Sequence, residues 1–179
     1  GSEENTILFV FIFIIILVSS IIPQFRTLYN IKIVTRQFSL VTIVAMGQAL
    51  VIITGGFDLS VGAIAALSGM SCSYFSVILN WPIAISVLFA LAIGAICGVF
   101  NSILITKIKI NALIATLASG WIFQGIILVT SKGWPISDFP ENYTAIGQGQ
   151  FLGITFPVIY MILIGIILTI FLSSSYTYL

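Results

Sequence analysis

Six apolar runs, each about as long as a helix that crosses a bilayer, dominate the sequence. A membrane-spanning helix needs roughly twenty mostly apolar residues. Sixty per cent of the 179 residues are hydrophobic and only six per cent are charged, whereas soluble domains carry about a quarter charged residues. We therefore predict an all-α polytopic membrane protein, a single transmembrane domain over 1–179, with about six transmembrane helices near 6–22, 37–54, 60–79, 82–105, 111–130 and 156–173.

The segment between the second and third runs, Gly55–Gly62, is the most unusual stretch of the chain. It holds Asp58, the only acidic residue between Glu4 and Asp138. A carboxylate at the edge of hydrocarbon is expensive, so it indicates a functional or architectural role. Glycines permit a helix break, and short polar side chains cap helix amides. We predict a helix break and helix cap formed by Gly55, Gly56, Asp58, Ser60 and Gly62. The alternative is that the Asp58 carboxylate binds a cation.

Two further sets of residues within the apolar runs have patterns of their own. Small residues repeat every four positions in the fourth apolar run, and such a stripe lets a neighbouring helix approach closely. The pattern predicts helix packing at Ala90, Gly94, Gly98 and Ser102. Amide and hydroxyl side chains within the runs serve either as hydrogen bonds between helices or as groups that line a solute pathway. The pathway candidates are Gln48, Thr54, Asn101, Thr116, Ser119 and Gln124.

The connections between the runs bear on orientation. The 131–155 connection has about 25 residues, a length that is commonly functional or carries a short helix of its own. The short Lys107–Lys109 connection indicates a cytoplasmic loop by the positive-inside rule, which places both termini inside and 131–155 outside. The same choice leaves Arg26, Lys32 and Arg36 outside, which the rule disfavours.

Several function classes are disfavoured by what the sequence lacks. It has no histidine, no phosphate-binding glycine loop and no pair of carboxylates within a plausible catalytic constellation. A net charge of +1 with scattered basic residues argues against nucleic acid. Cys72 and Cys97 lack metal-ligand spacing and are expected to be small buried hydrophobes. We expect a transport subunit rather than an enzyme, with neither metal nor cofactor.

One stretch carries a family resemblance. The run from Arg36 to Gly62, above all Thr54-Gly-Gly-Phe-Asp-Leu-Ser-Val-Gly62, resembles the permease subunits of bacterial ABC sugar importers, in the branch that includes the ribose and autoinducer-2 systems. Weaker matches follow in the order and spacing of that family, from about Arg36 to Pro157: Gly94-Ala-Ile-Cys-Gly98-Val-Phe-Asn101, Ala115-Thr-Leu-Ala118 and Gly133-Trp-Pro-Ile-Ser. Because such permeases continue into a coupling loop and further helices, the chain resembles their N-terminal half.

The resemblance implies a set of partners. Members of the family form a pathway for a sugar or sugar-like solute with a second permease subunit, receive the solute from a periplasmic binding protein and obtain energy from separate ATPase subunits. It also implies the bacterial inner membrane, with the 131–155 connection as a candidate contact for the binding protein. Two alternatives stay open: half of an ion-coupled secondary transporter with a discontinuous helix at Gly55–Gly56, and a structural membrane subunit.

Overall fold

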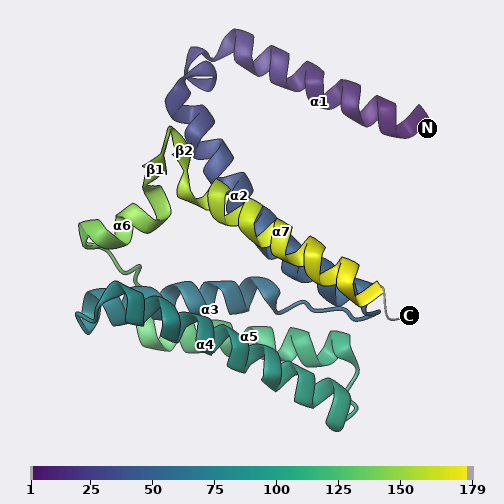
Figure 1. Cartoon of the computed structure of the whole chain (residues 1–179), viewed down its shortest axis with the longest axis vertical. Coiled ribbons are helices and arrows are strands. Elements are labelled where there is room, and N and C mark those ends of the chain that lie inside the picture. The colour runs from purple at the N-terminus through teal and green to yellow at the C-terminus, as the bar shows by residue number, and fades with distance from the viewer. Residues whose placement is uncertain (1, 177–179) are drawn as a thin grey trace.

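A computed structural model describes residues 2–176, without the side chains of residues 2–4, 142 and 174–176. The described chain is almost entirely helical (Figure 1). The helices are α1 (Ser2–Ile21), α2 (Leu28–Ile53), α3 (Val61–Ser73), α4 (Ile83–Ser102), α5 (Ala112–Ser131), α6 (Glu141–Gln148) and α7 (Phe156–Tyr176). A short 3-10 turn, Pro23–Arg26, joins α1 to α2, and single π-helical segments extend α3 through Tyr74–Ile78 and α4 through Ile103–Lys107.

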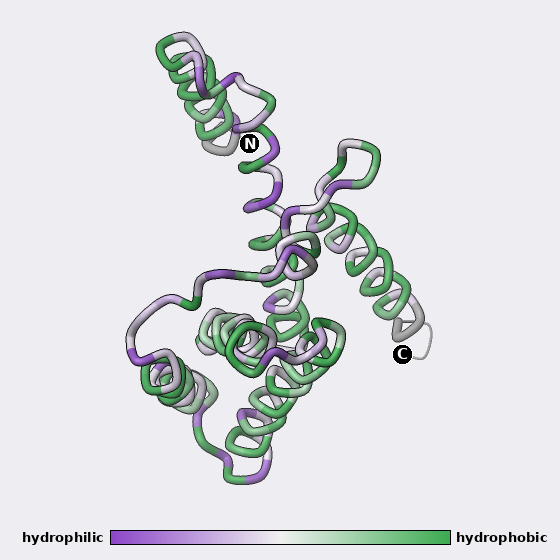
Figure 2. The backbone as a smooth tube through the Cα atoms, turned by 90° about the vertical axis from the view of Figure 1, so that its left-hand side faces the viewer, coloured by the Kyte–Doolittle hydropathy of each residue, from purple (hydrophilic) through white to green (hydrophobic). Residues whose placement is uncertain are grey.

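Five helices in the described part of the chain are long and apolar enough to cross a membrane. They are Leu28–Ile53, Val61–Ile78, Ile83–Lys107, Ala112–Ser131 and Phe156–Ser173. The expected first span lies in α1, where Asn5–Ile21 forms a shorter apolar helix. Hydrophobic residues fill these helices while polar residues gather in the turns (Figure 2). The structure thus confirms the all-α membrane architecture.

The start of α2 differs from the sequence prediction. The apolar run predicts a start near residue 37, but the helix begins at Leu28. The side chain of Thr27 caps it by accepting a hydrogen bond from the Asn30 amide at 3.2 Å. Hydropathy marks only the part of a helix that suits hydrocarbon. A capped polar extension therefore escapes a search for apolar runs.

The spanning helices form two groups, and α1 projects away from both (Figure 1). In one group α2 packs along α7; in the other α3 packs against α4 and α5. Gly165 on α7 allows a close approach, because an added Cβ would lie 3.2 Å from Met46 on α2. The second group holds the apolar core, formed by Ala63, Leu67, Cys97 and Phe123.

The long connection after α5 carries structure of its own, as expected from its length. It contains α6 and a two-stranded antiparallel hairpin, β1 (Gln150–Phe151) and β2 (Ile154–Thr155), in which Gln150 pairs with Thr155. The Lys32 ammonium group donates to Gln150 at 2.8 Å and ties the hairpin to α2. The Tyr143 hydroxyl lies 2.9 Å from the Ser73 hydroxyl and ties α6 to α3. The connection therefore contacts both groups of helices.

Candidate functional site

Two glycines end α2. Gly55 has φ +76°, a left-handed conformation that only glycine adopts without strain. The Gly55 amide donates to the Ile52 carbonyl and the Gly56 amide donates to the Val51 carbonyl, each at 2.9 Å. This pair of bonds is the Schellman motif, which satisfies carbonyls at a helix C-terminus. The predicted break at Gly55–Gly56 is therefore confirmed. The chain turns back there, and α3 runs in the opposite direction (Figure 1), so no single discontinuous helix passes through the break.

Asp58 closes the turn that leads into α3. One of its oxygens, Oδ1, accepts from the Ser60 amide at 2.7 Å and from the Ser60 hydroxyl at 2.6 Å. Ser60 is the N-cap residue but makes no side-chain cap bond. The expectation that Ser60 caps the helix through its side chain is therefore wrong, because its hydroxyl is directed toward Asp58 instead. The Asp58 carboxylate likewise binds the residue before the helix rather than a first-turn amide.

Polar side chains from α4 and α5 hold the start of α3 in place. Asn101 Nδ2 donates to Ser60 Oγ at 2.7 Å. The Leu59 amide donates to Thr116 Oγ1 at 3.1 Å, and that hydroxyl in turn donates to the Ala112 carbonyl of its own helix. Ser60 and Thr116 are fully buried and Asn101 is 3% exposed. We call Asp58, Ser60, Asn101 and Thr116 the α3 anchor.

The α3 anchor lies deeper along the bundle than the turn that joins α4 to α5. Asn101 precedes Lys107 by six residues, and Thr116 follows Asn111 by five. At 1.5 Å per helical residue, the anchored break lies about 7 to 9 Å inward from that turn. The loop between α2 and α3 therefore reaches into the depth that the spanning helices cover, where its polar groups need protein partners.

Three of the six pathway candidates, Asn101, Thr116 and Ser119, come together at this point. Ser119 is buried and donates to the Thr116 carbonyl at 3.1 Å within α5. Asn101 Oδ1 has no partner but is enclosed by protein. These buried side chains connect helices or bond within one helix, which favours a packing role over contact with a solute.

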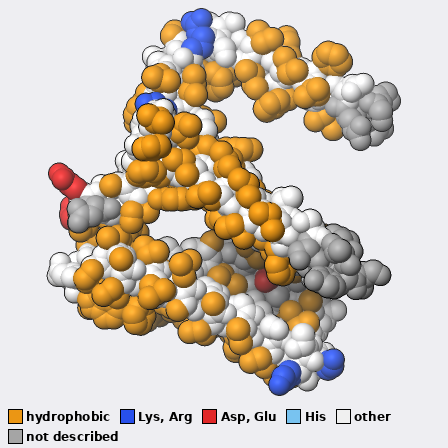
Figure 3. All heavy atoms as spheres, viewed as in Figure 1, with side chains coloured by type: hydrophobic (Ala, Val, Ile, Leu, Met, Phe, Trp, Pro, Cys, Tyr) orange, Lys and Arg blue, Asp and Glu red, His pale blue; other side chains and the backbone are white. Residues whose placement is uncertain are grey.

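Gln48 has a different environment. Its Oε1 is buried and has no hydrogen-bond partner. Gln48 lines a cavity of about 510 Å³ together with Asp58 and Gly62, and aliphatic residues of α2 and of the segment 59–61 form the remaining wall. The cavity thus lies beside the break, between α2 and the start of α3. In the space-filling view the two groups of helices are separated by an opening in which acidic atoms are recessed (Figure 3).

The remaining two pathway candidates lie apart from both places. Thr54 is exposed and its hydroxyl donates to the Val51 carbonyl of its own helix at 2.8 Å. Gln124 is exposed on α5. The structure brings neither of them to the cavity beside Gln48.

The stripe of small residues on α4 divides into two halves. Ala90 is buried, and a Cβ added to Gly94 would lie 2.9 Å from the Ser68 hydroxyl of α3. These two positions therefore allow the close approach that we predicted. Gly98 has open space around it and Ser102 is exposed. The prediction of packing is wrong for this second half within the described chain, because a spacing of four residues drifts around a helix of 3.6 residues per turn.

The contacts that fix the 131–155 connection have no signal in the sequence. Tyr143 and Ser73 are 70 residues apart, and Lys32 and Gln150 are 118 apart. No local pattern links such pairs, although an amphipathic turn at 141–148 is a signal for a short surface helix. Burial raises the pKa of the Tyr143 phenol, and the bond from Ser73 opposes that rise.

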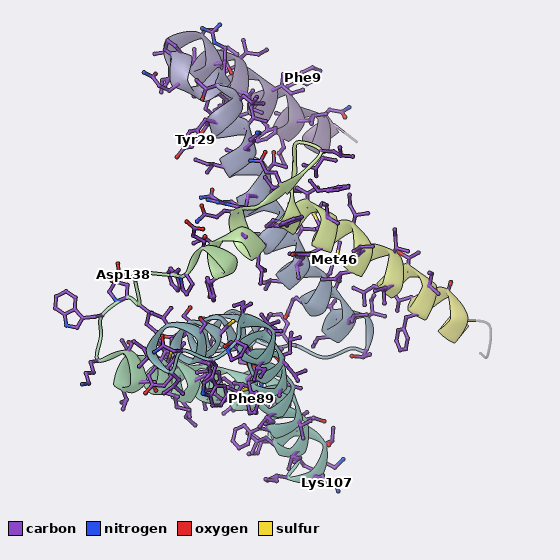
Figure 4. The ribbon with its side chains drawn as sticks, turned by 60° about the vertical axis from the view of Figure 1, so that its left-hand side comes forward. Phe9, Tyr29, Met46, Phe89, Lys107 and Asp138 are labelled. Atoms are coloured by element: carbon purple, nitrogen blue, oxygen red, sulfur yellow. The ribbon has the colours of Figure 1, made fainter. Side chains whose placement is uncertain are left out.

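Lys107 and Asp138 mark two different ends of the α3–α5 group. Lys107 follows α4, and Asp138 lies beyond the far end of α5 (Figure 4). Following the helices in order, the end near Lys107 also receives the C-terminal ends of α2 and α7, while the basic residues before Arg36 share the end with Asp138. In the described part of the chain, no three histidine, cysteine, aspartate or glutamate residues gather as a metal site.

Comparison with known proteins gives one family and a consistent set of relatives. A family model described as the permease component of the branched-chain amino acid transport system matches residues 30–177. The ribose import permease of Bacillus subtilis is 40% identical over 170 residues, which cover 93% of this chain and 52% of that protein. The ribose import permease of Haemophilus influenzae is 38% identical over 152 residues, 82% of this chain and 46% of that protein.

A relative with a different named cargo gives the same picture. The autoinducer 2 import permease of an Enterobacter species is 30% identical over 148 residues, which cover 80% of this chain and 42% of that protein. The chain thus spans about half the length of the curated relatives that it matches. No solved structure gives a significant match.

Proposed function

The chain belongs to the family of permease components of the branched-chain amino acid transport system type, and from this we propose that it forms part of the membrane pathway of an ATP-driven importer for a sugar or sugar-like solute. The observation that carries the proposal is the set of relatives. Import permeases for ribose, arabinose, allose and autoinducer 2 are 30 to 40% identical to it over 80 to 93% of its length.

Energy and solute delivery come from other subunits in this proposal. Separate ATPase subunits would hydrolyse ATP on the cytoplasmic side, and a periplasmic binding protein would deliver the solute at the 131–155 connection. A second permease subunit would complete the pathway, as would the further length that the relatives possess. The contacts of the connection with both helical groups support a docking role, since a partner bound there touches the α2–α7 pair and the α3–α5 bundle together.

We place the protein in a bacterial inner membrane with both termini in the cytoplasm. This orientation puts the Lys107–Lys109 turn and the α3 anchor toward the cytoplasm and the hairpin toward the periplasm. The basic residues Arg26, Lys32 and Arg36 then lie outside. A cysteine introduced by Ile108→Cys should react with a membrane-impermeant maleimide only after the cells are opened, whereas Leu152→Cys should react in intact spheroplasts. The reverse pattern would invert the proposed orientation.

Uptake of radiolabelled sugar tests the function. Deleting the gene for the permease should abolish uptake of ribose, arabinose or allose, and inactivating the partner ATPase should do the same. Collapse of ion gradients by an uncoupler should leave uptake intact while cellular ATP is maintained. Uptake that survives loss of the ATPase but falls with the uncoupler would support an ion-coupled carrier, and uptake unchanged by deletion would support a structural subunit.

A further inference from the structure

Two hydrogen-bond acceptors beside the break have capacity that the protein does not use. Gln48 Oε1 is buried without a partner. Asp58 uses Oδ1 for both bonds from Ser60, and Oδ2 accepts none from the described residues. Both side chains line the same cavity of about 510 Å³. An unpaired buried acceptor costs about 1 to 3 kcal/mol, so Gln48 beside a cavity that also has a carboxylate in its wall indicates a ligand.

The depth of these groups strengthens the argument. Gln48 lies five residues before the end of α2, and the α3 anchor holds the break about 7 to 9 Å inward from the α4–α5 turn. Both residues therefore lie within the depth that the spanning helices cover, beside the break. The buried hydroxyls of Thr116 and Ser119 close by are hydrogen-bonded within the protein.

The wall of the cavity defines the chemistry of the ligand. Most of it is aliphatic, with a carboxylate and an amide as the polar groups. Hydroxyl groups of a sugar donate to such acceptors, while its C–H faces lie against aliphatic side chains. A phosphorylated sugar would bring its negative charge toward the Asp58 carboxylate in a region of low dielectric constant, where like charges repel strongly.

We infer that Gln48 and Asp58 form a binding site for the hydroxyl groups of a neutral sugar along the translocation pathway. The inference rests on the proposed function and extends it by separating the residues that contact the solute from those of the α3 anchor that hold helices. Asp58 belongs to both sets, since its Oδ1 closes the turn and the residue also lines the cavity. Gly62 lines the same cavity, and a Cβ added there meets no neighbouring atom within 4 Å, so a larger side chain at this position would extend into free space.

Thiol protection in the full-length permease, reconstituted with its ATPase and binding protein, tests the site. The variants Gln48→Cys and Ile108→Cys are made in a background with Cys72→Ala and Cys97→Ala; Ile108 is exposed in the turn between α4 and α5. A small hydrophilic methanethiosulfonate reagent should label both variants. Saturating ribose, arabinose or allose, whichever is transported, should slow labelling of Gln48→Cys at least threefold. Ribose 5-phosphate should not slow it, and neither compound should affect labelling of Ile108→Cys, the control outside the spanning helices.

Blocking the cavity gives a second readout that does not depend on the cysteine background. Gly62→Leu adds bulk where space is free, and it should reduce uptake at least tenfold at an unchanged level of assembled transporter. Gly125→Leu on α5, where an added side chain also meets no atom within 4 Å, should transport at the rate of the unmodified protein.

Three outcomes would overturn the site. They are ATP-dependent uptake without protection of Gln48→Cys, protection by ribose 5-phosphate equal to that by the transported sugar, and equal uptake by Gly62→Leu and Gly125→Leu. In each case the unmodified transporter still carries sugar, so the proposed function stands while the site fails. If the unmodified transporter carries none of the three sugars, the proposed function and the site fall together.

Discussion

The hydroxyl of Ser60 is the central connection of the α3 anchor, and its removal gives a quantitative prediction. The change Ser60→Ala eliminates two hydrogen bonds: the one that Ser60 donates to Asp58 at 2.6 Å and the one that it accepts from Asn101 at 2.7 Å. The bond to the carboxylate is of the charged kind, which contributes about 1.5 to 3 kcal/mol. A neutral bond between helices in a membrane contributes about 0.6 kcal/mol on average.

The sum predicts that Ser60→Ala lowers the free energy of unfolding by about 2 to 3.5 kcal/mol. Neither polar atom of the Asn101 side chain then has a partner, because Nδ2 loses Ser60 and Oδ1 has no partner in the intact protein. Ser102→Ala is the matched control: it removes the same hydroxyl from an exposed position on α4, and surface changes of this kind stay within about 0.5 kcal/mol.

Reversible unfolding in mixed micelles, followed by circular dichroism as the fraction of denaturing detergent rises, measures both variants. Ser60→Ala should unfold at a clearly lower fraction than Ser102→Ala. Equal stability of the two variants would refute the reasoning, because it would mean that the bonds joining α3, the break and α4 contribute nothing net to the fold.

Four further predictions follow from single contacts. Gly94→Leu should impair assembly, because an added Cβ already lies 2.9 Å from the Ser68 hydroxyl. Gly98→Leu should assemble normally in the isolated chain. Equal yields of the two folded variants by size-exclusion chromatography would contradict this prediction. Thr27→Ala should speed amide hydrogen exchange in the first turn of α2, since loss of an N-cap costs about 0.5 to 2 kcal/mol; unchanged exchange would exclude the cap. Burial raises the pKa of Tyr143, so the folded state holds the phenol proton more tightly than the unfolded state. The free energy of unfolding should therefore fall as pH rises above about 10, the ordinary tyrosine pKa. Tyr143→Phe should weaken this pH dependence, and an identical pH profile for the variant would refute the prediction. Gln48→Met should raise the free energy of unfolding by about 1 kcal/mol, because it removes an unpaired acceptor, and it should reduce sugar uptake. A more stable variant with full uptake would mean that Gln48 does not contact the solute.

The fold was predictable where hydropathy decides it. Long apolar runs must become helices in a bilayer, because each backbone amide and carbonyl needs an internal partner there. The stop at Gly55–Gly56 was also predictable, since the left-handed conformation of Gly55 is easy only for glycine. The start of α2 at Leu28 was not, because its capped first turns are polar and lie outside the apolar run.

The site was predictable by residue type but not by position. Gln48 and Gln124 are both amides inside apolar helices, yet Gln48 lines the cavity and Gln124 is exposed. The rotation of a helix about its own axis decides between these environments. In a soluble protein the polar face of a helix reveals that rotation, but here nearly every face is apolar. The bond from the Leu59 amide to Thr116 is equally hidden, because it joins residues 57 positions apart.

The polar residues within the spanning helices therefore differ in whether their hydrogen-bonding groups have partners, rather than in residue type. Thr116 and Ser119 bond within the protein, and their burial contributes to a fixed arrangement of α3 and α5. Asn101 donates to Ser60 through its Nδ2 and does not line the cavity beside the break. Gln48 alone of the six pathway candidates combines an unpaired acceptor with a cavity. An unpaired acceptor lowers stability, and replacement by an aliphatic residue would remove that loss. Gln48 shares the cavity wall with the Asp58 carboxylate. A site for hydroxyl groups requires such acceptors, because it must hold groups that the protein itself leaves free.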